Sequence, residues 1–161
     1  MKKTLTIQFV ARLKAALVTA GYRVTDNVGI TEDDRFSFDI FGIVPYTGTT
    51  YRERVHVSTG TIPGRHFSDG RDAVAKDGEL LVAMEAICGG MTNYLRRYAR
   101  VNIPGIVDDI VKCNKQLDHN AKYSEAWNEC RKQGYHNEGA KTRFMNKYLA
   151  EHFPGEFSKL K

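Results

Sequence analysis

Residues 89–100 read GGMTNYLRRYAR, and their secondary structure decides how the rest of the chain is interpreted. The stretch joins three arginines to two tyrosines within about three helical turns, and on a helix the residues four apart share a face. Guanidinium groups bind phosphates by paired hydrogen bonds, and tyrosine rings either stack on bases or pack into a core. Two interpretations are therefore open for five of these residues: they contact a nucleic acid, or they form an ordinary helix face. The five residues are Arg96, Arg97, Arg100, Tyr94 and Tyr98.

The segments before this stretch change between helical and strand periodicity. Hydrophobic spacing predicts an N-terminal helix that ends at Gly21, then three short strands, a Gly-rich loop and one long helix that carries the arginines. In chain order these elements cover residues 5–20, 22–25, 36–41, 51–58, 59–72 and 73–101. We therefore expect an α+β core whose element order is helix, three strands, helix.

Four further arginines lie on the third predicted strand or in the loop that follows it. Residues two apart on a strand share a face, so Arg52 and Arg54 are expected on one face together with His56. Arg65 and Arg71 lie among the glycines of the loop. These four arginines are weaker candidates for phosphate contacts than those of the predicted long helix.

The chain beyond Pro104 is expected to be helical throughout. Its predicted helices are 106–117, 123–132 and 138–152. We therefore divide the chain into a core domain, residues 1–104, and a helical C-terminal appendage, residues 105–161. The appendage is basic, which favours either a second nucleic-acid contact or a solvated surface, and its basic residues include Lys141, Arg143, Lys147, Lys159 and Lys161.

Composition is that of a globular protein with a bias towards polyanionic partners. An apolar fraction of 42% and a charged fraction of 27% are ordinary, whereas a net charge of +5 favours a nucleic-acid partner without requiring one. Cys88, Cys113 and Cys130 are odd in number and lack a CxxC spacing, which argues against a disulfide framework and a zinc site and indicates a reducing cytosol. No stretch approaches the length of a membrane span, so a cytoplasmic location is expected.

The region around residues 89–109 resembles the signature of the ERF (essential recombination function) family of phage single-strand annealing proteins, within the Rad-fifty-two-like superfamily. The signature contains a small-residue pair, a tyrosine, the run Arg-Arg-Tyr-Ala, then Gly-Ile and acidic residues. The matching residues are Gly89, Gly90, Tyr94, Arg96, Arg97, Tyr98, Ala99, Gly105, Ile106, Asp108 and Asp109. The chain departs from the family at Asn93, Arg100 and Pro104, although Arg100 matches a further arginine of the Rad-fifty-two-type basic helix.

The resemblance implies a fold, an activity and an assembly. The fold would be a bent, three-stranded antiparallel sheet backed by the long basic helix. The activity would be binding and annealing of single-stranded DNA in homologous recombination, independent of sequence and of ATP, with no cofactor, no metal and no bond made or broken. The partners would be single-stranded DNA and further copies of the chain, in a ring or filament, inside a phage-infected bacterial cell.

Two functions of other classes remain open. A metal-dependent nuclease of the PD-(D/E)xK type would use Asp39 and Glu53 as magnesium ligands, but it needs a lysine where this chain has Val55. A phage inhibitor of a host defence protein would use the same basic surface for a protein contact. His56 and His66 each begin a His-x-Ser motif, as in two-histidine phosphoesterases, but they lie too close in sequence for that symmetric geometry.

Overall fold

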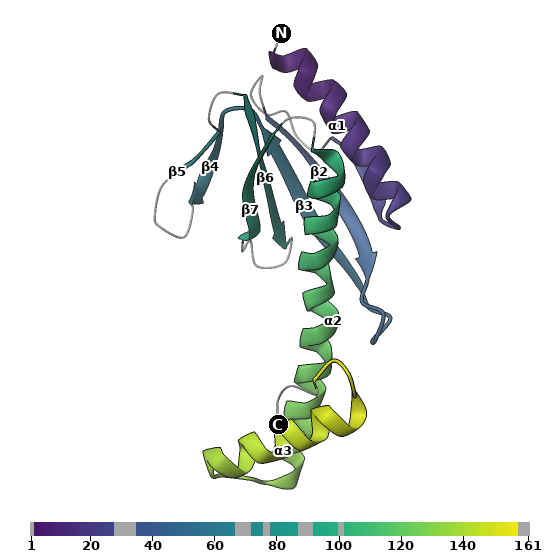
Figure 1. The fold of residues 1–161 in the computed structure, drawn as a ribbon, viewed down its shortest axis with the longest axis vertical. Helices are drawn as coiled ribbons and strands as arrows, with labels where there is room; N and C mark the ends of the chain where they lie inside the picture. Colours follow the sequence, from purple (N-terminus) through teal and green to yellow (C-terminus); the bar gives the residue numbers. More distant parts are fainter. Residues whose placement is uncertain are drawn as a thin grey trace. The chain divides into compact units, whose positions relative to one another are not determined.

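The fold is taken from a computed structural model, which describes residues 2–27, 35–66, 72–75, 78–86, 92–99 and 102–157. Within these residues the chain is a mixed α+β protein with three helices and seven strands (Figure 1). It divides into two compact units: residues 1–43 with 49–114, and residues 44–48 with 115–161. The division between residues 114 and 115 lies inside a helix, ten residues beyond the boundary expected from the sequence.

The first unit begins with helix α1 (Lys2–Thr19), which a glycine ends as the sequence predicts. Gly21 has a φ of 106°, a conformation that favours glycine. Its N–H donates to the Val18 carbonyl at 3.0 Å, and the Tyr22 N–H donates to the Leu17 carbonyl at 3.1 Å, which together form a Schellman cap. Leu17 and Tyr22 also pack in the same hydrophobic core, so the cap turns the chain from the helix directly into the sheet.

The main sheet has five antiparallel strands in the order β1-β2-β3-β6-β7 (Figure 1). These strands are β1 (Arg23–Asn27), β2 (Arg35–Ile43), β3 (Thr50–Ser58), β6 (Glu79–Ala86) and β7 (Thr92–Ala99). A separate two-stranded sheet contains β4 (Thr61–His66), inside the segment expected to be a loop, and β5 (Asp72–Val74). The three predicted strands are confirmed as β1, β2 and β3, but the sheet is larger than the three-stranded sheet expected.

One face of the main sheet is buried against α1 and the first part of α2 (Ile103–Gln133). Alternate strand residues fill this interface, and burial of each such side chain contributes about 1.5–3 kcal/mol. The core consists of Phe9, Val10, Leu13, Leu17, Phe38, Ile40, Val55, Val57, Leu80, Val82, Met84, Tyr98, Ile103, Ile106 and Ile110. The opposite face of β2 and β3 carries charged residues together with the Phe41 ring.

The long helix predicted over residues 73–101 is wrong, because this segment contains β5, β6 and β7. Strand β6 is buried on both faces: Leu80 and Val82 belong to the core beneath the helices, whereas Leu81 packs against Ile62 of β4. A strand buried on both faces is a continuous apolar run, and such a run lacks the period of two that identifies a strand. The predicted basic helix of residues 89–100 is therefore replaced by β7 over residues 92–99.

The second unit contains the greater part of α2 and all of α3 (Glu138–His152). The two helices predicted before residue 133 are one continuous helix, whereas α3 has the predicted bounds. Gly134, with a φ of 74°, follows α2, and the Asn137 side chain accepts hydrogen bonds from the N–H groups of Gly139 at 2.8 Å and Ala140 at 3.2 Å. Among the described residues, no helix combines the length and the apolar content that a membrane crossing requires.

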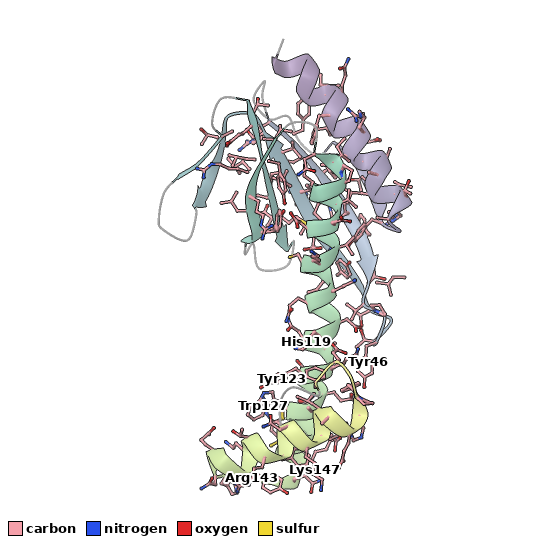
Figure 2. The ribbon with its side chains drawn as sticks, in the orientation of Figure 1. Tyr46, His119, Tyr123, Trp127, Arg143 and Lys147 are labelled. Carbon is pink, nitrogen blue, oxygen red and sulfur yellow. The ribbon has the colours of Figure 1, made fainter. Side chains whose placement is uncertain are left out.

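The tip of the β2–β3 hairpin, residues 44–48, belongs to this second unit. The Tyr46 N–H donates to Asp118 of α2 at 2.7 Å, and the Tyr46 hydroxyl donates to Glu125. The Tyr46 ring, which Figure 2 labels, packs edge-on against Phe153, with 5.2 Å between the centroids. The second unit is thus assembled from two segments that lie far apart in the sequence.

Candidate nucleic-acid interface

The sheet face opposite the helices carries charged residues on β2 and β3. Arg54 lies directly opposite Asp39 in the antiparallel ladder, and Arg52 lies opposite Phe41. Directly opposite residues share a face, and so do residues two apart on one strand. The prediction that Arg52 and Arg54 share a face is therefore confirmed.

Asp39 holds both of these guanidinium groups. Its side chain is fully buried and accepts hydrogen bonds from Arg52 Nε at 2.8 Å and from Arg54 Nε at 2.9 Å, with a shorter contact from Arg52 Nη2. Burial acts to raise the pKa of this carboxyl, but the hydrogen bonds from Arg54 and Arg52 outweigh it, so the pKa lies below its ordinary value. One carboxylate therefore fixes two cations, and one positive charge remains in excess.

Phe41 lies between two guanidinium groups on the same face. The guanidinium carbon of Arg23, which lies opposite Phe41 on β1, is 4.2 Å from the ring centroid, and that of Arg52 is 5.5 Å from it. Both distances are within the cation–π range of about 6 Å. Arg23 is exposed and has no carboxylate partner among the described residues. We refer to Arg23, Phe41, Arg52 and Arg54 as the sheet-face arginine cluster.

Beside this cluster, three polar side chains form a chain of hydrogen bonds across β2, β3 and β6. The Ser37 hydroxyl lies 2.6 Å from His56 Nδ1, and His56 Nε2 lies 3.0 Å from Glu85. These residue types also form hydrolase triads, but a nucleophile must be reachable, and Ser37 is only 4% exposed. We therefore assign this chain of hydrogen bonds to the satisfaction of polar groups within the sheet.

Strand β7 separates the two arginines that the predicted helix would place side by side. Arg96 lies on the side of α2, with 61% of its side chain exposed, and its Nη1 is 3.2 Å from Asp109. Arg97 lies on the other face, where its Nε is 3.9 Å from Glu79. The expectation that they share one surface is wrong, because neighbouring residues of a strand point to opposite faces. Arg100 lies outside the described residues.

The tyrosines of β7 contact α2 instead of offering open rings. The Tyr98 hydroxyl donates to Asp109 at 2.6 Å, and the Tyr94 hydroxyl donates to the same carboxylate at 3.5 Å. Tyr98 is buried and Tyr94 is half-buried; burial, with a smaller effect of Asp109, raises the pKa of Tyr94 above its ordinary value. Of the two roles considered for these tyrosines, the structure supports packing in the core.

A groove of about 400 Å³ remains between β7 and α2 within the first unit. Arg96 and Lys112 line it, and both are exposed. Because Asp109 lies between them and pairs with Arg96, this groove holds less unneutralised charge than the sheet-face arginine cluster. It is the weaker anion site of the two.

The pair of carboxylates considered for a nuclease does not form a metal site. Glu53 lies opposite Ile40 on the helix-covered face of the sheet, whereas Asp39 lies opposite Arg54 on the other face. The two carboxylates therefore lie on opposite sides of the sheet and cannot bind one ion together. Among the described residues, no group of three His, Cys, Asp or Glu side chains is arranged to hold a metal.

The remaining predicted arginines add no described contact to the cluster. Arg65 lies in β4, and Arg71 lies outside the described residues. Arg23 is not among the residues predicted from the sequence, because its place beside Phe41 follows from the register of β1 against β2. Its position in a predicted strand is the only sequence signal for it.

Comparison of the chain with protein-family models, with curated proteins and with solved structures gives no match.

Proposed function

We propose that this protein binds single-stranded DNA, without a sequence preference, through the sheet-face arginine cluster. The observation that carries the proposal is the Phe41 ring between the guanidinium groups of Arg23 and Arg52. A guanidinium that stacks through its flat face keeps the N–H groups at its edge available for a phosphate, which applies fully to Arg23. Arg52 donates through Nε and Nη2 to Asp39, so its Nη1 is the group left for a phosphate. Asp39 holds Arg52 and Arg54 in fixed positions, which lowers the entropy lost when a phosphate binds.

Annealing of complementary strands and self-assembly extend this proposal, on the strength of the sequence resemblance at Arg96, Arg97 and Tyr98. The DNA-binding surface proposed here differs from the basic helix expected from the sequence. The phosphates would contact β1, β2 and β3 instead of the segment around residue 96. Annealing would need neither ATP nor a metal, because base pairing supplies the free energy.

Fluorescence anisotropy with labelled single-stranded and duplex oligonucleotides at several salt concentrations tests the proposal. We expect tighter binding to the single strand and a steep loss of affinity with salt, because each neutralised phosphate releases counterions. Replacement of Arg23 and Arg52 together by Ala should lower affinity on the order of tenfold at 0.1 M salt and reduce the salt slope by about 1.4. This variant leaves Arg54 paired with Asp39, so the fold is retained.

The matched control is Arg12→Ala with Lys115→Ala, which removes the same net charge from exposed positions on α1 and α2. If both double variants lose affinity equally, the effect comes from overall charge and the assigned surface is wrong. If the wild-type protein binds neither oligonucleotide, the proposed function is wrong, and the phage-inhibitor alternative becomes the one to test, by capture of a protein partner. Sizing of the protein alone, and the rate of pairing of complementary strands, then test self-assembly and annealing.

A further inference from the structure

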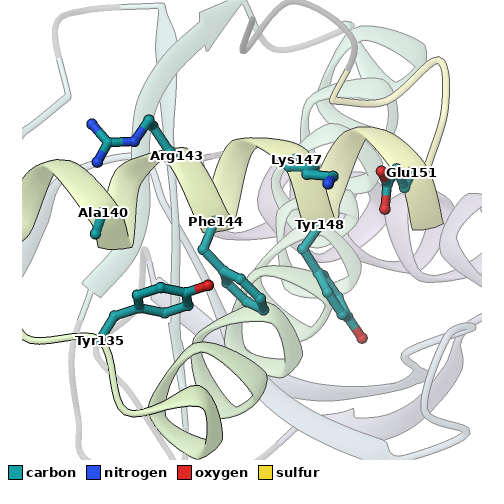
Figure 3. Close-up of a pocket in the computed structure, with 7 residues that line it drawn as sticks. All are labelled: Tyr135, Ala140, Arg143, Phe144, Lys147, Tyr148 and Glu151. Carbon is teal, nitrogen blue, oxygen red and sulfur yellow. The ribbon is translucent and has the colours of Figure 1, made fainter.

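A ladder of aromatic rings runs along one side of α3 in the second unit. The rings of Phe144 and Tyr148 are stacked at 26° with centroids 5.8 Å apart, and Tyr148 stacks on His152 at 3.9 Å. Tyr135, which precedes α3, lies at the end of the ladder next to the start of the helix, and its ring centroid is 5.4 Å from that of Phe144 (Figure 3). Phe144 and Tyr148 are partly buried against the core of this unit, whereas Tyr135 is 42% exposed. Core packing therefore accounts for two of these rings but not for Tyr135.

Two cations that have no ion-pair partner among the described residues lie next to this ladder. Arg143 and Lys147 are four residues apart on α3, so they share one side of the helix. Both are exposed, and neither has an ion pair with another described residue. By contrast, Lys132 of the same unit pairs with Glu129 at 2.9 Å, and Lys141 pairs with Glu138 at 3.3 Å. Arg143 and Lys147 therefore place unneutralised positive charge beside the ladder.

Three rings of the ladder and the two cations line one groove of about 440 Å³; the rings are Tyr135, Phe144 and Tyr148 (Figure 3). This volume falls within the range of about 300–1,000 Å³ that is typical of small-ligand sites. Glu151 lines the far end of the groove, one helical turn beyond Lys147. An anion is thus favoured at the end near Arg143 and disfavoured at the end near Glu151.

We propose that this groove binds a nucleotide unit, with the base against Tyr135 and the phosphate between Arg143 and Lys147. The chemistry requires both a flat ring and an anion, since an aromatic ring alone leaves the two cations unused and a phosphate alone leaves Tyr135 unused. The nucleotide is either free or part of a single strand. The inference does not rest on the proposed function, because the groove lies in the other unit and needs none of the sheet-face arginine cluster.

The test uses the full chain and two probes: a 5′-fluorescein-labelled oligo(dT) followed by anisotropy, and AMP followed by calorimetric titration. Tyr135→Ala should weaken binding about fivefold or more, the lower limit for loss of one stacking contact. Arg143→Ala with Lys147→Ala should weaken binding and lower the salt slope for the oligonucleotide by about 1.4. Glu151→Gln should tighten binding about twofold, because it removes the repelling carboxylate.

Lys132→Ala with Lys141→Ala is the control, because it removes two paired cations from the same unit. Circular dichroism verifies that each variant is folded. Loss with both probes assigns the groove to any nucleotide, and loss with oligo(dT) alone assigns it to nucleotides within a strand. If AMP binding depends on Tyr135 while the wild type does not bind the strand, this inference holds and the proposed function is wrong.

The inference is overturned if the Tyr135 and the Arg143 and Lys147 variants bind both probes like the wild type. It is also overturned if the control loses as much affinity as the Arg143 and Lys147 variant. An equal, Tyr135-dependent affinity for duplex DNA would likewise contradict it, because paired and stacked bases cannot lie against Tyr135.

Discussion

Strands β3 and β7 each carry two arginines, and the spacing of the pair decides what each strand can bind. Arg52 and Arg54 are two residues apart, so both lie on one face and share Asp39. Arg96 and Arg97 are adjacent, so they lie on opposite faces and contact different carboxylates. A run of two arginines is thus a concentrated charge on a helix but a divided charge on a strand. The Arg-x-Arg spacing is the one that builds a basic surface on a sheet.

The largest expected effect is on stability, from the loss of the arginine pair on β3. Arg52→Ala with Arg54→Ala removes both guanidinium groups that bond to Asp39 and cover it, which should lower the free energy of unfolding by about 2–3 kcal/mol. Arg96→Ala with Arg97→Ala removes two solvent-accessible ion pairs and should cost less than about 1 kcal/mol. Urea unfolding of the two double variants measures the difference.

A third substitution provides the control for this comparison. Asp39→Asn added to the Arg52 and Arg54 double variant should change stability by less than about 0.5 kcal/mol, because the carboxylate no longer has either cation as a partner. A double variant on β3 that unfolds at the same urea concentration as the one on β7 would contradict the role given to Asp39.

The second effect is the pH dependence of stability that the Asp39 carboxylate causes. The pKa of Asp39 is lowered by the hydrogen bonds from Arg54 and Arg52, against the effect of burial, so its ionised form stabilises the fold. That contribution is fully present above the unfolded-state pKa of about 3.9, and it is lost as the pH falls through the lowered native pKa. Asp39→Asn should therefore cost about 1–3 kcal/mol at pH 7, and this cost should shrink as the pH falls below about 3.9.

Urea unfolding at a series of pH values measures this difference. Glu138→Gln on α3 is the matched control, since Glu138 is an exposed carboxylate that pairs with Lys141. An Asp39→Asn variant whose deficit is the same at pH 2 and pH 7 would show that packing, and not charge, is what the substitution removes.

The smallest expected effect is a difference in stability between variants of the two tyrosines of β7. Tyr98→Phe removes a 2.6 Å hydrogen bond to Asp109 from a buried ring and should cost about 1–2 kcal/mol. Tyr94→Phe removes a contact of 3.5 Å and should cost less than about 0.5 kcal/mol. Thermal unfolding compares the two variants, and an equal cost would mean that Asp109 does not distinguish the hydroxyls.

The sequence predicts the first half of the fold well because each element there has a simple period. The sequences of β2 and β3 alternate apolar and polar residues over much of their length, and from this alternation the common face of Arg52 and Arg54 can be predicted. Strand β6 has no such alternation, because Ile62 of β4 covers its second face, and β4 itself lies in a Gly-rich segment. That cover is a tertiary contact, so no local pattern reveals it.

The candidate site was only partly predictable for a related reason. The position of Arg23 against Phe41 depends on the register between β1 and β2, and the burial of Asp39 depends on the two arginines that cover it. The groove on α3 depends on Tyr135, which lies outside any predicted element. Alternation predicts which residues share a strand face, but it does not predict which strands are neighbours.

The tip of the β2–β3 hairpin, residues 44–48, belongs to the second unit, whereas its two strands belong to the first. This arrangement affects how the chain folds as it is synthesised. Tyr46 bonds to Asp118 and Glu125, which lie 72 and 79 residues further along the chain. At about 5–20 residues per second, the hairpin tip leaves the ribosome about 4–14 s before Asp118 does. Contacts between such distant segments form slowly, because a long loop must close first. The tip of the hairpin is therefore expected to acquire its protection from hydrogen exchange late, after the strands beside it and together with α3.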